Sequence, residues 1–231
     1  MRILAISDTH GFHGMFTNSD FDNIDMVIHA GDFSNSKIPV LNSVEALNFL
    51  EWYNDLPVKY KILISGNHET SIYKKLVDPR VYKNIIYLEH ESVCIEGINI
   101  FGSPYTPIFH DWAFNVRRDK LHDYWTSIPE NTDIVVTHGP PKGMLDLAYN
   151  GNILEYCGDV ALLKAVVKVN PRFHIFGHIH QNENNYNAGR RTSLVARTEF
   201  INASCMLDGK FSRGLNTKGI IINFDILSPL K

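Results

Sequence analysis

The sequence predicts an α/β fold with a parallel β-sheet, and two observations support this. Several short apolar runs, such as Ile62–Ile64, lack the alternation of a half-exposed strand, which is typical of strands buried on both faces. Between two of these runs, Val44–Tyr53 carries apolar residues at loosely helical spacing and ends before Pro57. A strand, a helix and a strand at this spacing form a βαβ unit, in which the two strands are parallel.

Five apolar runs end alike, in a short polar turn that contains Asp, Asn or His beside a glycine. The five turns are Ser7-Asp8-Thr9-His10-Gly11, Gly31-Asp32, Ser65-Gly66-Asn67-His68-Glu69, His138-Gly139-Pro140-Pro141 and Gly177-His178-Ile179-His180. Gly66 lets the backbone turn away from its strand without the penalty that a side chain brings. Because open α/β sheets bind ligands at the carboxyl ends of their strands, we expect these side chains to gather at one edge.

The other elements follow in order along the chain. We expect strands at about Arg2–Ile6, Met26–Ala30, Ile62–Ile64, Ile85–Leu88, Ser92–Glu96, Ile98–Phe101, Ile134–Thr137, Phe173–Phe176, Thr198–Ala203 and Gly219–Phe224. We expect helices at Val44–Tyr53, Thr70–Val77, Arg117–Trp125 and Val160–Val169. Glu96-Gly97 predicts a hairpin turn, and Ser103–Asn115 predicts a long ordered loop. No repeat, low-complexity tract or linker interrupts the chain, so we expect one domain over residues 1–231.

Composition excludes several classes of protein. Of the 231 residues, 44% are hydrophobic and 20% are charged, which predicts a globular domain with a sizeable core. The net charge of -3 argues against a general nucleic-acid coat or a polybasic membrane binder. No apolar run approaches the ~20 residues of a membrane helix, and the chain opens into a strand without a signal-peptide pattern.

The three cysteines indicate the compartment. Cys94, Cys157 and Cys205 are widely spaced and form no C-x-x-C pair, which argues against a disulfide framework and against a thiolate zinc site. We therefore expect a soluble, cytoplasmic protein.

The side chains at the five strand ends are those that bind transition metals. The candidate ligands are Asp8, His10, Asp32, Asn67, His138, His178 and His180. Imidazole and carboxylate groups without thiolates suit manganese, iron or zinc. Seven ligands exceed the needs of one ion and fit two ions that share a bridging carboxylate. Paired metals of this kind serve in-line displacement at phosphorus.

These turns together resemble the motifs of the calcineurin-like metallophosphoesterase superfamily. The matching motifs are Asp8-x-His10, Gly31-Asp32, Gly66-Asn67-His68-Glu69, His138-Gly139 and Gly177-His178-x-His180. Three further segments are similar to the metallophosphoesterase-domain-containing branch: Thr137–Gly143, the loop Ser103–Pro107 with Trp112-x-Phe114-Asn115, and Ile201–Ser204. The resemblance covers nearly the whole chain and implies a four-layer α-β-β-α sandwich of two mixed β-sheets flanked by helices.

The resemblance also implies a role for each residue of the site. One metal ion would be held by Asp8, His10, Asp32 and His180, and the other by Asp32, Asn67, His138 and His178, with Asp32 bridging. A hydroxide between the ions would be the nucleophile, and His68 would be the general acid that protonates the leaving oxygen. We expect two divalent ions, manganese before iron or zinc.

The function that follows is a dinuclear phosphodiesterase for small phosphodiesters, with cyclic nucleotides among the candidates. The alternatives are a phosphomonoesterase, a nuclease, or a weakly active metal-bound scaffold protein. The full ligand set and His68 argue against a scaffold, which needs no general acid. The acidic balance argues modestly against a nuclease. The expected partner is therefore a small phosphoester, with neither a membrane nor nucleic acid.

One residue departs from the family pattern. Many relatives have an Asp three residues after the bridging Asp, where it orients the catalytic His, but this chain has Asn35. We expect the Asn35 amide oxygen to accept a hydrogen bond from the ring of His68 without supplying a negative charge.

Other polar and aromatic residues have structural interpretations. We expect His29 and His174 to be buried in strands, and His13, His90, His110 and His122 to lie in loops or on the surface. Lys142, Arg117 and Arg118 are expected to be exposed rather than to bind phosphate. The loop aromatics Tyr105, Phe109, Trp112 and Phe114 are expected to pack among themselves.

Overall fold

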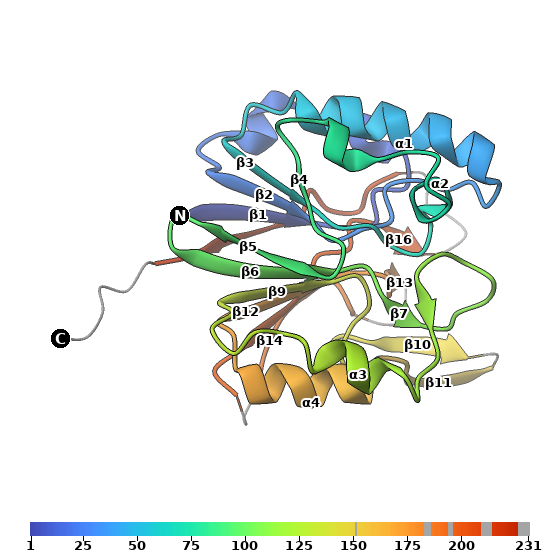
Figure 1. Cartoon of the computed structure of the whole chain (residues 1–231), viewed down its shortest axis with the longest axis vertical. Helices are drawn as coiled ribbons and strands as arrows, with labels where there is room; N and C mark the ends of the chain where they lie inside the picture. Colours follow the sequence, from blue (N-terminus) through green and yellow to red (C-terminus); the bar gives the residue numbers. More distant parts are fainter. Residues whose placement is uncertain (151, 183–185, 194–195, 209–213, 226–231) are drawn as a thin grey trace.

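The computed structural model describes residues 1–150, 152–182, 186–193, 196–208 and 214–225. Two β-sheets pack face to face in the middle of the molecule, with α1 (Pro39–Asn54) outside one sheet (Figure 1). Helices α3 (Leu121–Trp125) and α4 (Val160–Val169) lie outside the other. The predicted α-β-β-α sandwich is confirmed.

The first sheet has the strand order β17-β1-β2-β3-β4. Its strands are β1 (Arg2–Ile6), β2 (Met26–His29), β3 (Tyr60–Leu63), β4 (Ile86–Tyr87) and β17 (Ile220–Asn223). Strands β1 to β4 are parallel, and β17 pairs with β1 in the antiparallel direction. The predicted βαβ unit is therefore β2, α1 and β3.

The second sheet has the order β14-β15-β12-β9-β6-β5. Its strands are β5 (Glu91–Ile95), β6 (Ile98–Ser103), β9 (Ile134–Thr137), β12 (Phe173–Phe176), β14 (Gly189–Thr192) and β15 (Glu199–Asn202). The four central strands are parallel, and the edge strands β5 and β14 are antiparallel to their neighbours.

Shorter elements complete the fold around these sheets. Among the described residues, three strand pairs lie outside the two sheets: β7 (Thr106–Pro107) with β8 (Asn115–Val116), β10 (Leu147–Asn150) with β11 (Ile153–Tyr156), and β13 (Gln181–Asn182) with β16 (Leu207–Asp208). The remaining helices are η1 (Phe12–Met15), η2 (Asn18–Phe21), α2 (Thr70–Tyr73) and η3 (Pro79–Val81).

Alternate residues of each buried strand supply different layers of the core. In β1, Ile3 and Ala5 pack in the apolar layer between the two sheets, whereas Leu4 and Ile6 pack in the layer under α1. Because successive strand residues point to opposite faces, a strand between two apolar layers must be apolar throughout. The continuous apolar runs of the sequence have this origin.

Some element boundaries differ from the prediction. Helix α1 begins at Pro39 rather than Val44, because proline fits the first turn of a helix. Helix α2 has four residues instead of the predicted Thr70–Val77, since Lys75 adopts a left-handed backbone (φ 60°) that ends it. Helix α3 begins at Leu121 rather than Arg117. The hairpin β10–β11 was not predicted.

The two sheets are joined where their strands end. Ser7, after β1, forms an isolated parallel bridge with Ser204, after β15. Cys205 also donates its backbone N–H to the carbonyl of Ser7 (2.9 Å). The strand ends of both sheets therefore meet at one edge of the sandwich. Among the described residues, no helix has both the length and the apolarity needed to cross a bilayer.

Asp159 connects the two outer helices, and its loss should destabilise the fold. Its carboxylate caps α4 by accepting from the N–H groups of Ala161 (3.0 Å) and Leu162 (3.1 Å), and it accepts the indole N–H of buried Trp125 (2.5 Å). Asp159→Ala should lower the free energy of unfolding by about 2–4 kcal/mol. Urea denaturation measures this loss. Asp159→Asn keeps part of the cap and should lose less, whereas equal stability of Asp159→Ala and wild type would contradict this role.

Candidate metal centre

Two glycines allow the strand ends to approach one another. A Cβ on Gly66 would stand 2.5 Å from the His138 ring, and one on Gly177 would collide with the side chains of Ser7 and Asp8. Neither position therefore accepts a side chain without displacing a residue of the site. The glycines found in the sequence motifs are required by this close packing.

Four of the predicted ligands have a left-handed backbone. The φ angles are 53° at Asp8, 42° at His10, 57° at Asp32 and 69° at His178. Asp and His tolerate this region better than most residues, yet such positions cost of the order of 1–3 kcal/mol each. The turns aim these side chains into one space, and the surrounding hydrogen bonds hold them there.

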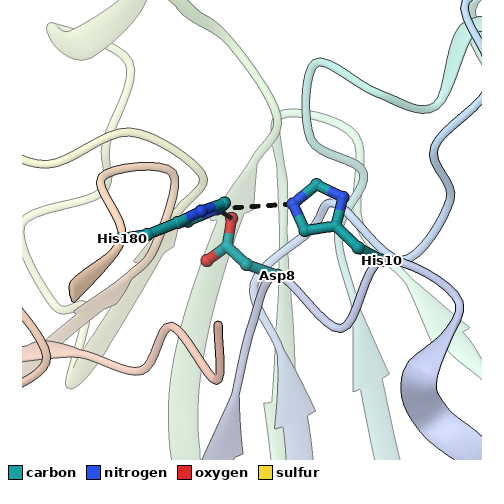
Figure 2. Close-up of side chains that lie close together, drawn as sticks. All are labelled: Asp8, His10 and His180. Atoms are coloured by element: carbon teal, nitrogen blue, oxygen red, sulfur yellow. Dashed lines mark hydrogen bonds and ion pairs between the residues drawn. The ribbon is translucent and has the colours of Figure 1, made fainter. Parts of the chain in front are cut away.

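One group of predicted ligands comes from the first sheet and from the turn after β12. Figure 2 shows Asp8, His10 and His180 pointing toward one another. The Nε2 atom of His180 lies 3.3 Å from Asp8 Oδ1 and 3.3 Å from His10 Nε2. Their potential ligand atoms all lie within 4.8 Å of one another, so one cation fits among them.

A second group lies deeper, and its members are Asp32, Asn67, His138 and His178. His138 Nε2 lies 3.1 Å from Asp32 Oδ2 and 3.0 Å from Asn67 Oδ1. Asp32, His138 and His178 also have ligand atoms within 4.8 Å of one another. Asp32 forms a further group of this kind with His10 and His68, so its carboxylate lies close to members of both ligand groups. The structure thus brings the seven predicted ligands close together, in two neighbouring groups.

Hydrogen bonds to the ring Nδ1 atoms suit these histidines to metal binding. His138 Nδ1 donates to the Ala30 carbonyl (2.8 Å), and His10 Nδ1 donates to the Ser34 carbonyl (3.2 Å). His180 Nδ1 donates to Asp208 Oδ1 (2.7 Å). Metal-binding histidines usually donate one ring N–H to an oxygen in this way, which leaves the other nitrogen for the ion. The donor set therefore fits a pair of divalent ions.

Without metal, protons balance the charge in this centre. Burial lowers the pKa of His138, but the facing Asp32 carboxylate outweighs it and raises the pKa to about 9. Burial likewise opposes the charge of His180, but Asp208 and Asp8 raise its pKa to about 10. For His178, burial lowers the pKa to about 3. The positive charges of protonated His138 and His180 thus balance the nearby carboxylates when no metal is bound.

Glu69 holds the turns that carry Asp32 and Asn67. Its buried carboxylate accepts the backbone N–H groups of Asp32 (2.9 Å), Phe33 (3.0 Å), Ser34 (3.1 Å) and Gly66 (2.6 Å), and also the Ser34 hydroxyl (2.8 Å). Burial and the Asp32 carboxylate raise the pKa of Glu69 to about 7, and these hydrogen bonds oppose the rise. Glu69 therefore positions ligands without being one.

His68, the predicted general acid, stands at the edge of the centre. Its Nε2 atom lies 3.9 Å from Asp32 Oδ2, and its side chain is 21% exposed. The Trp112 ring stacks on it, with centroids 4.0 Å apart and planes at 23°. Its buried Nδ1 has no hydrogen-bond partner among the described residues. Stacking rather than a hydrogen bond therefore orients the ring.

The expected contact between Asn35 and His68 is wrong. The Asn35 amide nitrogen donates to the backbone carbonyl of His10 (2.6 Å). Within the described part of the chain, no hydrogen bond joins Asn35 to His68. Asn35 therefore supports the backbone of a predicted ligand, His10, instead of the ring of His68.

The other histidines mostly match their expected places. His29 is buried and shares hydrogen bonds with Thr9 (3.0 Å) and the Gly31 N–H (3.2 Å), and buried His174 bonds Thr137 (2.8 Å). His110 and His122 are exposed, and His90 is half-buried. His13 differs from a solvated loop residue, because it is buried against the rings of Phe49 and Trp52 in α1.

The loop aromatics divide into two pairs. Phe114 and Tyr105 pack against each other as expected, and Phe114 is buried. Trp112 instead covers His68, and Phe109 is 49% exposed beside the ring of His178, so packing alone was the wrong expectation for these two.

The basic residues make local contacts. Arg118 donates to the carbonyls of Cys157 (2.8 Å) and Gly158 (3.1 Å), and Lys142 donates to that of Tyr156. Exposed Arg117 pairs with Asp119 (3.0 Å).

Asp208 is a further partner of the site that the sequence did not predict. It lies in β16, far along the chain from the five turns, and it binds His180 at 2.7 Å. No motif identifies it, because the contact depends on how the last strands return to the site.

Comparison with known proteins agrees with these observations. The model of the calcineurin-like phosphoesterase family matches residues 1–182. The chain is 35% identical to metallophosphoesterase domain-containing protein 1 of Homo sapiens, over 88% of this chain and 65% of that protein. It is 32% identical to a UPF0046 protein of Caenorhabditis elegans, over 85% of this chain and 69% of that protein. The chain thus spans 65% of the length of the human relative.

Solved structures share the fold. A crystal structure from Thermus thermophilus matches 88% of this chain and 88% of its own, with a TM-score of 0.59 and 13% identity. The phosphopantetheinyl hydrolase of Mycobacterium tuberculosis matches 87% of this chain and 88% of its own, with a TM-score of 0.53 and 15% identity. At these identities the likeness shows the fold alone.

Metal binding should displace protons from the two imidazolium groups. Because the pKa values of His138 and His180 are raised to about 9 and 10, both rings are protonated at neutral pH in the metal-free protein. Manganese binding at pH 7.5 should release about two protons, and the apparent affinity should rise between pH 7 and 9. Calorimetry in buffers of different ionisation enthalpy measures this release. The His138–Asp32 and His180–Asp8 pairs stabilise the metal-free fold below pH 6.5. This stabilisation is lost as the pH rises through the raised pKa values of the two histidines.

A carboxylate variant provides the control for this release. Asp208→Asn removes a charge that raises the pKa of His180, so fewer protons should be released near pH 9. Asp25→Asn changes an exposed acid just before β2, at the opposite end of that strand from Asp32, and should have no effect on proton release. Binding at pH 7.5 without proton release would show that the two rings are neutral.

Proposed function

The chain belongs to the calcineurin-like phosphoesterase family, and on this premise we propose that it is a dinuclear metal-dependent phosphodiesterase acting on small phosphodiesters. The observation that carries the proposal is the convergence of seven ligand side chains in two sets around Asp32, with His68 beside them. Family membership supports the hydrolysis of phosphoric esters, and the geometry supports two cations.

The ligands of the two proposed ions follow from the two sets. Asp8, His10 and His180 would hold one ion, Asn67, His138 and His178 would hold the other, and Asp32 would contact both. Bound ions of this kind activate water as a nucleophile and neutralise charge on the phosphoryl oxygens. We infer manganese, with iron or zinc as alternatives, from the imidazole and carboxylate donors.

His68 has the position that a general acid requires. It is partly exposed, whereas the ligand His138 is fully buried, so substrate can reach it. Its Nε2 atom faces the centre close to Asp32, and Trp112 limits the rotation of its ring. In this proposal, Nε2–H gives its proton to the leaving oxygen as the P–O bond breaks.

The proposed location is the cytoplasm. Cys94, Cys157 and Cys205 are all free thiols, and one of them is exposed. Unpaired cysteines of this kind suit a reducing compartment.

Replacing His68 tests the proposed function. Reconstituted with manganese, the protein should hydrolyse nitrophenyl and alkyl phosphodiesters. His68→Ala should lower the rate on an alkyl leaving group by about 10²–10⁴-fold and that on nitrophenolate much less, because a good leaving group departs without a proton. Metal content should remain unchanged, whereas Asp32→Ala should lose metal. Equal losses on both esters would exclude His68 as the acid, and activity in the absence of metal would exclude the proposed function.

Trp112 should affect the same reaction through His68. Trp112→Ala frees the His68 ring, so we expect turnover of an alkyl ester to fall by up to about 100-fold while a nitrophenyl ester is much less affected. Trp112→Phe keeps a stacking ring and should restore most of the loss. The NMR signals of the His68 ring should also lose their upfield ring-current shift in Trp112→Ala. Equal effects on both esters would indicate a structural role only.

A further inference from the structure

A large pocket opens beside the candidate metal centre. It has a volume of about 980 Å³ and reaches His178 and His180 at its inner end. The segment Pro107–Phe109 and the hairpin β10–β11 both contribute to its lining. We call this space the hairpin pocket. Its volume far exceeds that of a phosphate group and suits a sizeable organic group.

The hairpin is held firmly at its base, although its strands are largely exposed. Buried Asn187 accepts from the Leu147 N–H (3.0 Å) and donates to the carbonyls of Leu147 (2.8 Å) and His180 (3.0 Å). Asp146 accepts from the N–H groups of Gly143 (3.0 Å) and Gly158 (2.8 Å). One side chain therefore ties the hairpin to the backbone of a predicted ligand, which makes the hairpin a wall of fixed position.

Three aromatic side chains, Phe109, Tyr149 and Tyr156, are among the residues that line the pocket. Leu147 and Tyr149 lie on the same face of the hairpin as Tyr156, because Leu147 pairs directly with Tyr156 and side chains alternate along a strand. Phe109 also lines the pocket, and its ring contacts that of His178. Tyr149 and Phe109 are 55% and 49% exposed, as expected for side chains that a ligand covers.

The charged side chains that line the pocket form hydrogen bonds with neighbouring groups. Lys142 and Arg118 donate to backbone carbonyls of Tyr156, Cys157 and Gly158, and Asp208 binds His180. The lining holds two acids, Asp208 and Glu155, against these two bases. Since two acids and two bases line the pocket, its lining carries no net charge, and its aromatic side chains decide which group binds.

The position of His68 determines which arm of a phosphodiester substrate enters the hairpin pocket. His68 and Trp112 are not among the residues that line the hairpin pocket. Since the leaving oxygen must face His68, the leaving arm of a phosphodiester lies on the Trp112 side. The arm that stays on phosphorus is then directed past His178 and His180.

We propose that the hairpin pocket binds the retained arm of the phosphodiester and selects an arm that is aromatic and uncharged. This inference rests on the proposed function and adds a substrate class to it. Phe109 and Tyr149 supply the aromatic contacts, and a lining without net charge does not offset the desolvation of a further anionic group.

Binding of product-like monoesters tests the pocket without turnover. Calorimetry with the manganese-loaded full chain compares phenyl phosphate, methyl phosphate and 4-carboxyphenyl phosphate. Phenyl phosphate should bind at least about 10-fold more tightly than methyl phosphate, and 4-carboxyphenyl phosphate should bind more weakly than phenyl phosphate. Phe109→Ala and Tyr149→Ala should each reduce the preference for phenyl over methyl by about 3- to 10-fold. Ile153→Ala is the matched control, because Ile153 belongs to the same hairpin but does not line the pocket.

Kinetics separates failure of the pocket from failure of the proposed function. Bis(4-nitrophenyl) phosphate and methyl 4-nitrophenyl phosphate share a leaving group and differ only in the retained arm. The ratio of their kcat/KM values should fall in Phe109→Ala and Tyr149→Ala and stay constant in Ile153→Ala. Equal binding of phenyl and methyl phosphate, or an unchanged ratio in both pocket variants, would overturn the pocket assignment. Absence of hydrolysis of both diesters would overturn the proposed function, while the binding preference still decides on the pocket.

Discussion

The buried carboxylate of Glu69 joins the turn after β2 to the turn after β3, and the candidate centre depends on this contact. It accepts hydrogen bonds from four backbone N–H groups that the two sharp turns leave without partners, and a fifth from the Ser34 hydroxyl. A buried anion is tolerated when donors surround it in this way. Asp32 and Asn67 therefore have fixed positions before any ligand arrives.

The turns around this contact are strained, and the strain has a chemical use. Asp8, His10, Asp32 and His178 all adopt left-handed backbone conformations, which bring their side chains into one small space. Carboxylates that repel one another lie close together in this space. In the metal-free protein, protonated His138 and His180 offset their negative charge. A divalent ion takes over the same role with stronger interactions. The centre is thus preorganised for cations.

The outer parts of the site are built by segments outside the two sheets. The loop after β7 places Trp112 on His68, and the N–H of the next residue, Ala113, donates to the Asn67 carbonyl (3.0 Å). The hairpin β10–β11 forms the opposite side of the site and is attached through Asn187. The sheets therefore position the predicted ligands, while the segments outside them orient His68 and form the hairpin pocket.

The sequence by itself determined the features that are encoded locally. Strands between two apolar layers must be apolar throughout, so β1, β2, β3, β9 and β12 were visible as continuous runs, and the turns after them contained the predicted ligands. The tertiary structure alone decided the contacts between distant segments. Asp208 reaches His180, Asn35 turns to His10 instead of His68, and Trp112 stacks on His68, none of which has a signature in local spacing. Local patterns report which face of a strand is buried, but side-chain partners depend on how segments far apart in the chain pack together.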